Sequence, residues 1–257
     1  MASTDEILSI ITAVLFAVLF VQFANRFANS RWRVYAFILS FCAIRIVAYI
    51  LRAYIAVMNE GLSMGKTIKL DYPNYVSIVI TEMVFVSIGA IFILLLMSRL
   101  YHCLLPKLRH HAGHPRGRFE ATLVDHTRLF MLPVIACIIV GAVFASPGYS
   151  ADQQQIGLIC RKVGTVGLFL FALVYMGAAE TYRRRYPEAK RAFSTCVVVT
   201  GLFDVSLIYK IVATFYAPAP TNLAVYYIFS PLVELFALCF LCVDLQLHFM
   251  GLPEDKV

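Results

Sequence analysis

Seven stretches of almost uninterrupted apolar residues follow one another along the chain, separated by more polar segments. They cover residues 7–27, 34–57, 75–95, 129–145, 164–182, 194–215 and 224–249. A helix that crosses the hydrocarbon core of a bilayer needs about 20 mostly apolar residues, and it satisfies its backbone hydrogen bonds internally. A membrane β-barrel would alternate apolar and polar positions, whereas these runs are continuous. The pattern predicts an all-α integral membrane protein, a single domain of seven transmembrane helices over residues 1–257.

The basic residues are concentrated in every second connection between these stretches. If the N-terminus is lumenal, 15 of the 22 Lys and Arg residues lie in cytosolic segments and 4 lie in lumenal ones. Cytosolic loops of membrane proteins carry an excess of Lys and Arg. We therefore expect a lumenal or extracellular N-terminus and a cytosolic C-terminus. The acidic start, with Asp5 and Glu6, agrees with this orientation and argues against a cleaved signal peptide.

The composition narrows the class further. Hydrophobic residues make up 61% of the chain and charged residues only 14%, whereas soluble domains are about 25% charged. This shortage excludes a disordered protein and a nucleic-acid-binding protein. The net charge of +7 follows mainly from the topology, and anionic lipid headgroups are its expected partners. Four histidines within residues 101–114 have irregular spacing and no completing Cys or carboxylate, which favours a solvated basic linker over residues 99–128 and no metal site.

Six ionisable side chains lie inside the apolar stretches, in the middle or lumenal half of the predicted membrane. A charge near the bilayer centre is unfavourable by several kcal/mol, so each of them is a candidate functional residue. We expect the three cations and three anions to face one polar cavity and to compensate one another. Structural ion pairs that lock the bundle are the alternative interpretation. The six residues are Arg45, Arg52, Glu82, Asp204, Lys210 and Glu234.

Aromatic residues lie at similar depths. Tyr49 and Tyr209 fall deep in their stretches, together with Phe41, Phe85 and Phe203. Their rings could line a cavity and stabilise a passing cation. Packing in the core of the bundle explains them equally well.

A resemblance adds to this interpretation. Residues 31–52 read RWRVYAFILSFCAIRIVAYILR. This segment resembles the second helix of a fungal family of small seven-helix membrane proteins that includes the terpene cyclases of the ascochlorin and ascofuranone type. The likeness in topology covers the whole chain, but the motif covers only these residues. The Asn-Phe-x-Trp-Glu pattern of the other fungal membrane cyclases, typified by the pyripyropene pathway, is missing, since the only tryptophan is Trp32.

The resemblance implies an enzyme of secondary metabolism in the endoplasmic reticulum, a cyclising isomerase or lyase that needs neither metal nor cofactor. Such cyclases protonate an epoxide or alkene of a hydrophobic prenylated (meroterpenoid) substrate, guide the carbocation to ring closure and remove a proton. The roles then expected are Glu82 as general acid and Glu234 or Asp204 as its partner and terminal base. Substrate binding is assigned to Arg45, Arg52, Lys210, Tyr49, Tyr209, Phe85 and Phe203.

Two other classes of protein share this outline. A seven-helix receptor has the same topology, but Arg99 at the end of the third stretch follows Met97 and Ser98, with no acidic residue before it. A small transporter could use Arg45, Asp204 and Lys210 as a proton pathway. However, the chain shows no inverted repeat, and seven is an awkward number of helices for one.

Overall fold

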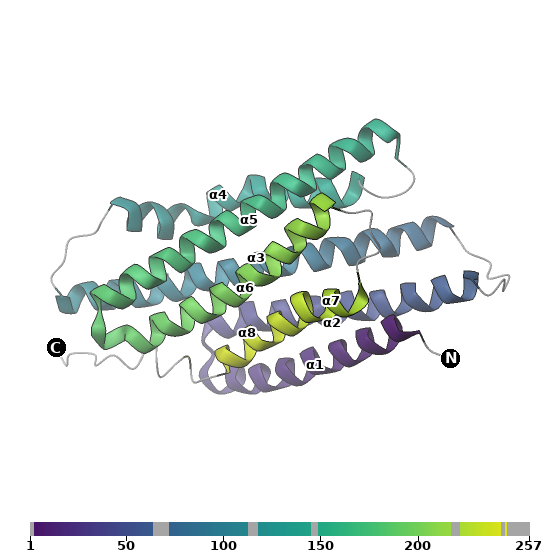
Figure 1. The fold of residues 1–257 in the computed structure, drawn as a ribbon. Coiled ribbons are helices and arrows are strands. Elements are labelled where there is room, and N and C mark those ends of the chain that lie inside the picture. The colour runs from purple at the N-terminus through teal and green to yellow at the C-terminus, as the bar shows by residue number, and fades with distance from the viewer. Residues whose placement is uncertain are drawn as a thin grey trace.

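The computed structural model describes residues 3–63, 72–112, 118–144, 149–216, 222–242 and 245, and these residues form a bundle of long helices (Figure 1). The elements in chain order are α1 (Thr4–Ser30), α2 (Arg33–Ser63), α3 (Tyr72–Ala112), α4 (Arg118–Phe144), α5 (Ala151–Arg185), the 3₁₀ turn η1 (Pro187–Ala189), α6 (Lys190–Tyr216), α7 (Leu223–Tyr227), the π-helical turn η2 (Ile228–Leu232) and α8 (Val233–Leu241).

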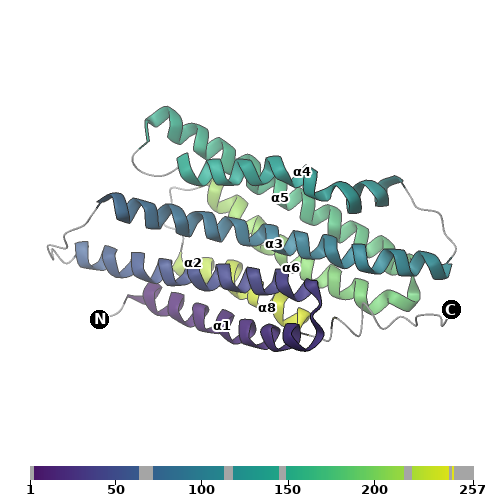
Figure 2. The same cartoon turned by 180° about the vertical axis from the view of Figure 1, so that it is seen from behind.

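Helices that follow one another in the chain lie side by side. Each helix from α1 to α5 packs against the next, and α8 packs against α6 and contacts α1. In both views of the ribbon the long helices lie side by side along one common direction, with α4 and α5 on one side of the bundle and α1 and α2 on the other (Figures 1 and 2). Short connections favour this antiparallel arrangement of neighbours. The turn between α1 and α2 is the tightest of them, and Arg31 takes the left-handed conformation with a φ of 52° to make it.

The helices are long and apolar enough to cross a membrane. Among the residues that the structure describes, six helical segments qualify by length and composition, the last of them formed by α7, η2 and α8 together, and α4 contributes a shorter apolar segment at Leu129–Phe144. On α1, apolar side chains point outward as well as inward, because Val14, Val18 and Val21 are more than half exposed while Phe16 and Phe23 are fully buried. A helix that is apolar on every face suits lipid on its outer side. The fold is therefore that of a multi-pass helical membrane protein.

Three helices extend well beyond the stretches predicted from hydropathy. Helix α3 continues to Ala112, and α4 begins at Arg118, so the basic linker expected over residues 99–128 is mostly helical and that expectation is wrong. Helix α5 begins at Ala151, where a lumenal loop was expected, and a capping box of Ser150 and Gln153 stabilises its start. The physical reason is that a helix does not have to end where the hydrocarbon ends, and hydropathy detects only the apolar part. The last residue of the fourth expected stretch, residue 145, lies outside the described residues. So do residues 243, 244 and 246–249 of the seventh expected stretch.

The last apolar stretch is interrupted. Helix α7 has one short turn, η2 is a π-helical turn that contains Pro231, and α8 follows without a loop. Proline lacks the N–H group that an α-helix needs at that position, and a π turn is a common way to accommodate the resulting break. The π turn ends at Leu232, two residues before Glu234 in the first turn of α8, and it therefore sets how that side chain enters the bundle.

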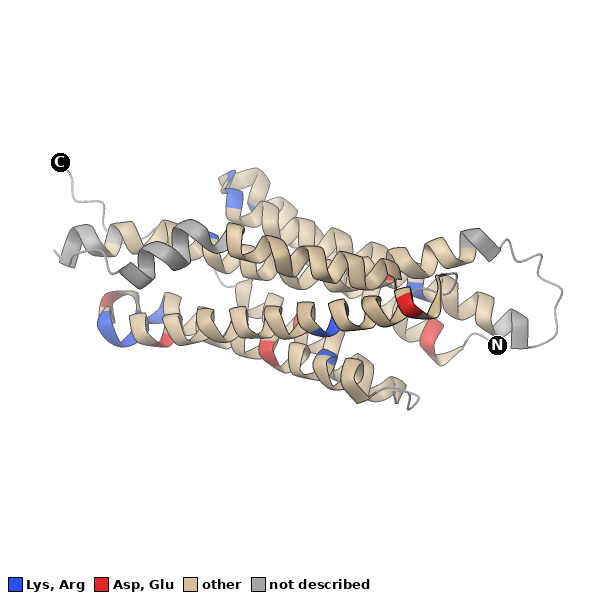
Figure 3. Cartoon of the chain, turned by 90° about the horizontal axis from the view of Figure 1, so that it is seen from above, with Lys and Arg blue, Asp and Glu red and all other residues tan. Residues whose placement is uncertain are grey.

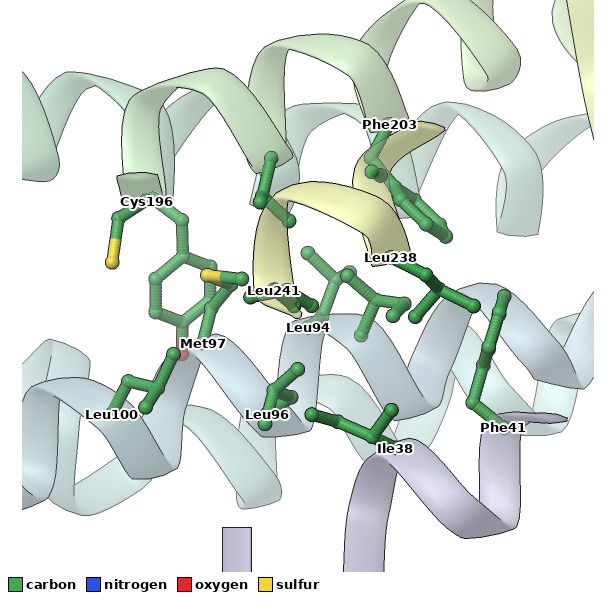
Figure 4. Close-up of a cluster of buried hydrophobic side chains, with 14 of the residues drawn as sticks. Ile38, Phe41, Leu94, Leu96, Met97, Leu100, Cys196, Phe203, Leu238 and Leu241 are labelled. Carbon is green, nitrogen blue, oxygen red and sulfur yellow. The ribbon is translucent and has the colours of Figure 1, made fainter. Parts of the chain in front are cut away.

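One part of the apolar core lies where α2, α3, α6 and α8 meet, and buried side chains of α1 and α5 continue it. Figure 4 shows side chains from these four helices packed against one another, with Phe41 and Phe203 close together at one end of the cluster. The rings of Phe41 and Phe203 lie 6.1 Å apart in an edge-to-face arrangement.

The charged residues are few along the bundle and gather at its ends. Coloured by charge, most of the ribbon is tan, and basic positions gather at the end away from the N-terminus (Figure 3). Arg183, Arg184 and Arg185 close the last turn of α5 at that end. Cations at a helix C-terminus interact favourably with its dipole. A second, smaller group of charged positions lies within the bundle, and it forms the candidate site.

Helices α4 and α5 approach closely through glycines, which gives a test of the packing. A Cβ atom at Gly141 would lie 2.6 Å from the backbone nitrogen of Arg161, whereas one at Gly177 would meet nothing within 4 Å. We expect Gly141→Ala to destabilise the protein by about 1–3 kcal/mol, because the backbones must move apart. Gly177→Ala is the matched control and should not destabilise it, since alanine favours helix. The measurement is the temperature at which half of the detergent-solubilised protein stops being monodisperse. Equal temperatures for the two variants would contradict the packing.

Candidate functional site

The centre of the site is the buried carboxylate of Glu234. Its Oε1 atom accepts hydrogen bonds from Arg45 Nη2 at 2.6 Å, from Lys210 Nζ at 2.9 Å and from Ser206 Oγ at 3.4 Å. The side chains of Arg45 and Glu234 are fully buried, and that of Lys210 is 17% exposed. A carboxylate that holds two cations is stabilised in its ionised form. Glu234 is therefore better suited to orienting charged groups than to donating a proton.

A glycine on the neighbouring helix makes room for the Arg45 guanidinium. A Cβ atom at Gly89 of α3 would lie 2.7 Å from Arg45 Cζ, so only glycine leaves the space that this side chain occupies. Arg45 Nη1 donates to the carbonyl oxygen of Val86 at 2.8 Å, and the guanidinium lies 5.1 Å from the centre of the Phe41 ring. Arg45 of α2 thus bonds to both α3 and α8. A hydropathy pattern can show that this residue is charged, but it cannot show which helices it contacts.

A second charged group surrounds Arg52, seven residues further along α2. Arg52 Nε donates to Asp5 Oδ1 at 3.2 Å, and Arg52 Nη1 lies 3.6 Å from Glu82 Oε1. Its guanidinium also lies 4.0 Å from the centre of the Tyr226 ring, which is a cation–π distance. Tyr227 donates its hydroxyl hydrogen to Asp5 at 2.7 Å. This group ties the start of α1 to α2, α3 and α7.

Asp204 stands apart from both groups. Its side chain is buried on α6, and neither carboxylate oxygen has a hydrogen-bond partner among the residues that the structure describes. A buried charge without hydrogen-bond or ionic partners is strongly disfavoured, so the environment of Asp204 favours its protonated, neutral form. Two of the three carboxylates predicted for the site form ion pairs: Glu82 with Arg52, and Glu234 with Arg45 and Lys210. The third, Asp204, has no ionic contact within the described chain.

Both charged groups border one partly open cavity of about 330 Å³. Residues from α2 to α7 line it, and its apolar wall comes mainly from α3, α4, α5 and α6. Cavities that hold small organic ligands have volumes of roughly 300–1,000 Å³ and are mostly apolar with a few polar groups. Every charged residue of the lining is a cation: Arg52, Arg161 and Lys210. The carboxylates that pair with Arg52 and Lys210 are not part of the lining.

The predicted aromatic residues divide between the cavity and the core. Tyr209 lines the cavity. Tyr49 is fully buried and stacks on Phe16 with ring centres 5.9 Å apart, and Phe203 packs in the apolar core. Phe85 is half-buried on α3 and is not among the residues that line the cavity. Of the ten residues predicted for the site, Arg52, Tyr209 and Lys210 line the cavity directly.

Two charged residues that belong to the site were not among those predicted. Asp5 lies in the first turn of α1 and contacts Arg52, and Arg161 lies on α5 and lines the cavity. Hydropathy placed both outside the membrane, in the lumenal end segment and in a lumenal loop. The sequence signal for Arg161 was its spacing, because residues 158, 161, 165 and 168 share one face if this segment is helical. The structure shows that this face lines the cavity.

The site offers acids, cations and hydroxyl groups for chemistry. Among the residues that the structure describes, no group of three or more His, Cys, Asp or Glu side chains could hold a metal ion.

The fold and this site define the class as a multi-pass helical membrane protein with an ion-pair network beside a cavity. Comparison with known proteins found no matching family model, no similar curated protein and no similar solved structure. The resemblance of residues 31–52 to the fungal cyclases therefore stays a prediction.

Proposed function

We propose that the protein is a membrane-embedded terpene cyclase that acts on a prenylated aromatic, or meroterpenoid, substrate. It protonates an epoxide or alkene of the prenyl chain, guides the carbocation to ring closure and removes a proton. The reaction is that of a cyclising isomerase or lyase and needs neither metal nor cofactor. The hydrophobic substrate enters from the lipid around the helices.

The proposal includes the topology. The apolar part of α4, Leu129–Phe144, is the fourth of seven transmembrane segments, because it lies between two longer helices and packs against both. The N-terminus is lumenal, since the arginines that close α5 then lie on the cytosolic side, as basic residues do in membrane proteins. The membrane is that of the endoplasmic reticulum, as the resemblance to the fungal cyclases implies.

The observation that carries the proposed function is the position of Glu82 relative to the cavity. Val86 and Ala90 line the cavity from α3, and Glu82 lies one turn before Val86, so all three share one face of the helix. The Glu82 side chain is 11% exposed and is held by Arg52 at 3.6 Å. A carboxylic acid beside a mostly apolar cavity is the arrangement that acid-initiated cyclisation requires.

The other residues take supporting roles. Arg52 and Lys210 orient polar groups of the substrate, and the Tyr209 ring offers a π face to the carbocation. Arg45 acts through Glu234, because it does not reach the cavity lining itself. Glu234, which Arg45 and Lys210 hold in its ionised form, is the terminal base. Asp204 lies one turn before the cavity-lining Leu207 on α6 and, as the neutral acid, is the second candidate for the proton donor.

The test is product formation by the purified full-length protein. We expect cyclised product from a farnesylated phenolic epoxide in nonionic detergent with EDTA and without nucleotide. The measurement is chromatography with mass spectrometry against a heat-inactivated sample. Absence of any cyclised product, together with ligand-dependent signalling in cells, would reject the enzyme in favour of a receptor. Absence of product with flux driven by a pH gradient in proteoliposomes would reject it in favour of a transporter.

A further inference from the structure

The charges around the cavity do not balance. Arg45, Arg52 and Lys210 are paired with Asp5, Glu82 and Glu234, so three cations meet three carboxylates. Arg161 adds a fourth cation to this neighbourhood and lines the same cavity. It makes no ion pair with any residue in the part of the chain that the structure describes. The charge of Arg161 interacts with that of Glu82, but the two form no ion pair, and Glu82 is already paired with Arg52. This neighbourhood therefore holds one cation more than it holds carboxylates.

The hydrogen-bond donors of the cavity point to the same place. Three of the side chains that line it are serine or threonine, and each already donates to a carbonyl oxygen four residues earlier in its own helix: Ser87 to Met83, Thr165 to Arg161 and Thr214 to Lys210. Tyr209 and Tyr226 also line the cavity, and their hydroxyl groups are buried without a hydrogen-bond partner among the described residues. Carboxylates already hold Arg52 and Lys210, so the donors that remain for a ligand are the Arg161 guanidinium and the hydroxyl groups of Tyr209 and Tyr226. The Arg52 guanidinium lies over the Tyr226 ring at 4.0 Å, which leaves Tyr209 as the hydroxyl donor away from Arg52.

The rest of the wall is apolar on the side of α4 and α5. Ile138, Leu158 and Leu168 line the cavity there, and Leu158 and Leu168 share the helix face of Arg161. A ligand that complements this lining therefore has an anionic group that pairs with Arg161 and an apolar part that packs against Ile138, Leu158 and Leu168. A guanidinium binds a carboxylate through two parallel hydrogen bonds, which favours a carboxylate over a neutral carbonyl group.

The geometry points to an anionic amphiphile as the ligand of this cavity, namely a prenylated aromatic acid whose carboxylate binds Arg161 and accepts a hydrogen bond from Tyr209. This inference rests on the proposed function, because it names the class of its substrate. It places the charged end of the substrate at α5 and leaves the prenyl chain to reach Glu82 at α3. The unpaired Arg161 is then neutralised by the substrate rather than by the protein.

A pair of ligands that differ only in charge tests this inference on the native protein. The probes are a radiolabelled farnesylated hydroxybenzoic acid and its methyl ester, and binding to the purified full-length protein in nonionic detergent is measured by scintillation proximity. We expect the acid to bind at least about tenfold tighter than the ester, which corresponds to about 1.4 kcal/mol. Equal affinities of the acid and the ester would overturn the inference.

Variants of two neighbouring cations locate the effect. Arg161→Gln should bring the ratio of the two affinities close to one, and Arg161→Lys should keep part of it. Lys162→Gln is the matched control, because it removes the same charge from the next residue, which lies over Phe215 and does not line the cavity. An unchanged ratio in Arg161→Gln, or the same loss in Lys162→Gln, would overturn the role of Arg161.

Two further arms separate this inference from the alternatives. Competition by oleate as strong as that by the unlabelled acid, with the same dependence on Arg161, would assign the anion site to a bilayer fatty acid and overturn the prenylated-acid assignment. Cyclisation of the ester as fast as that of the acid, without selective binding, would leave the cyclase standing and reject the inference. Acid-selective binding through Arg161 without any cyclised product would support the anion site and contradict the cyclase.

Discussion

Replacing Glu234 with leucine should destabilise the protein more than any other single substitution in the site. The change leaves Arg45 and Lys210 without the carboxylate that holds both, and Arg45 is fully buried. Removal of one partner from a buried ion pair destabilises proteins by about 3–5 kcal/mol, because the remaining charge is uncompensated. We expect the temperature of half-maximal loss of monodisperse protein in detergent to fall by roughly 10 °C.

Two comparisons separate this effect from a general loss of packing. Arg45→Met should be milder, since Glu234 keeps Lys210 at 2.9 Å. The double variant Arg45→Met/Glu234→Leu should be more stable than Glu234→Leu alone, because it removes opposite charges together. A double variant that is no more stable than Glu234→Leu would contradict the argument, and expression yield gives the same ranking if Glu234→Leu does not fold.

Glu180 supplies a matched control for the same substitution. It also contacts two cations, Arg183 and Arg184, each at 2.8 Å, but its side chain is 28% exposed near the end of α5. Exposed ion pairs contribute little to stability because water solvates the separated charges well. Glu180→Leu should therefore leave the transition temperature almost unchanged. A loss as large as that of Glu234→Leu would mean that burial does not decide the effect.

The sequence carried the ion-pair network at Glu234 in a form that could be predicted. A charge inside an apolar helix is so unfavourable that its type and depth alone restrict where it can go. Arg45, Lys210 and Glu234 all fall in the middle or lumenal half of their stretches and include opposite signs. The precise partners could not be predicted. They depend on the space above Gly89 and on the π turn before Glu234, which are properties of how helices pack and not of residue type. Pro231 was the visible sign that the last stretch is not one regular helix.

The boundaries of the site were harder to predict than its centre. Asp5 and Arg161 lie in segments whose hydropathy is low enough to suggest loops, although both belong to helices. Polar residues near helix ends are tolerated in loops and in helices alike, so residue type alone does not decide between them. Tyr49 shows the opposite case, because a deep tyrosine is expected equally in a cavity or in a core, and the stacking on Phe16 places it in the core.

Replacing Glu82 with glutamine should abolish most of the cyclisation while leaving the protein folded. Glutamine keeps the size of the side chain but cannot donate a proton as a carboxylic acid does. Arg52 keeps Asp5 at 3.2 Å and its position over the Tyr226 ring, so the second charged group stays in place. Loss of a general acid lowers rates by about 10²–10⁴-fold. The measurement is single-turnover formation of product, with binding of the substrate determined on the same sample.

The comparison with Asp204→Asn decides which carboxylic acid starts the reaction. If Glu82 is the donor, Glu82→Gln lowers the rate and leaves the affinity for substrate within about twofold, because Arg161 and Tyr209 still hold the ligand. Full activity in Glu82→Gln with loss of activity in Asp204→Asn would transfer the role to Asp204, whose oxygens have no hydrogen-bond partner among the described residues. Full activity in both variants would reject proton donation by either acid. A catalytic donor has to reach the substrate, and for that reason the acid on the cavity face of α3 is the one expected to matter.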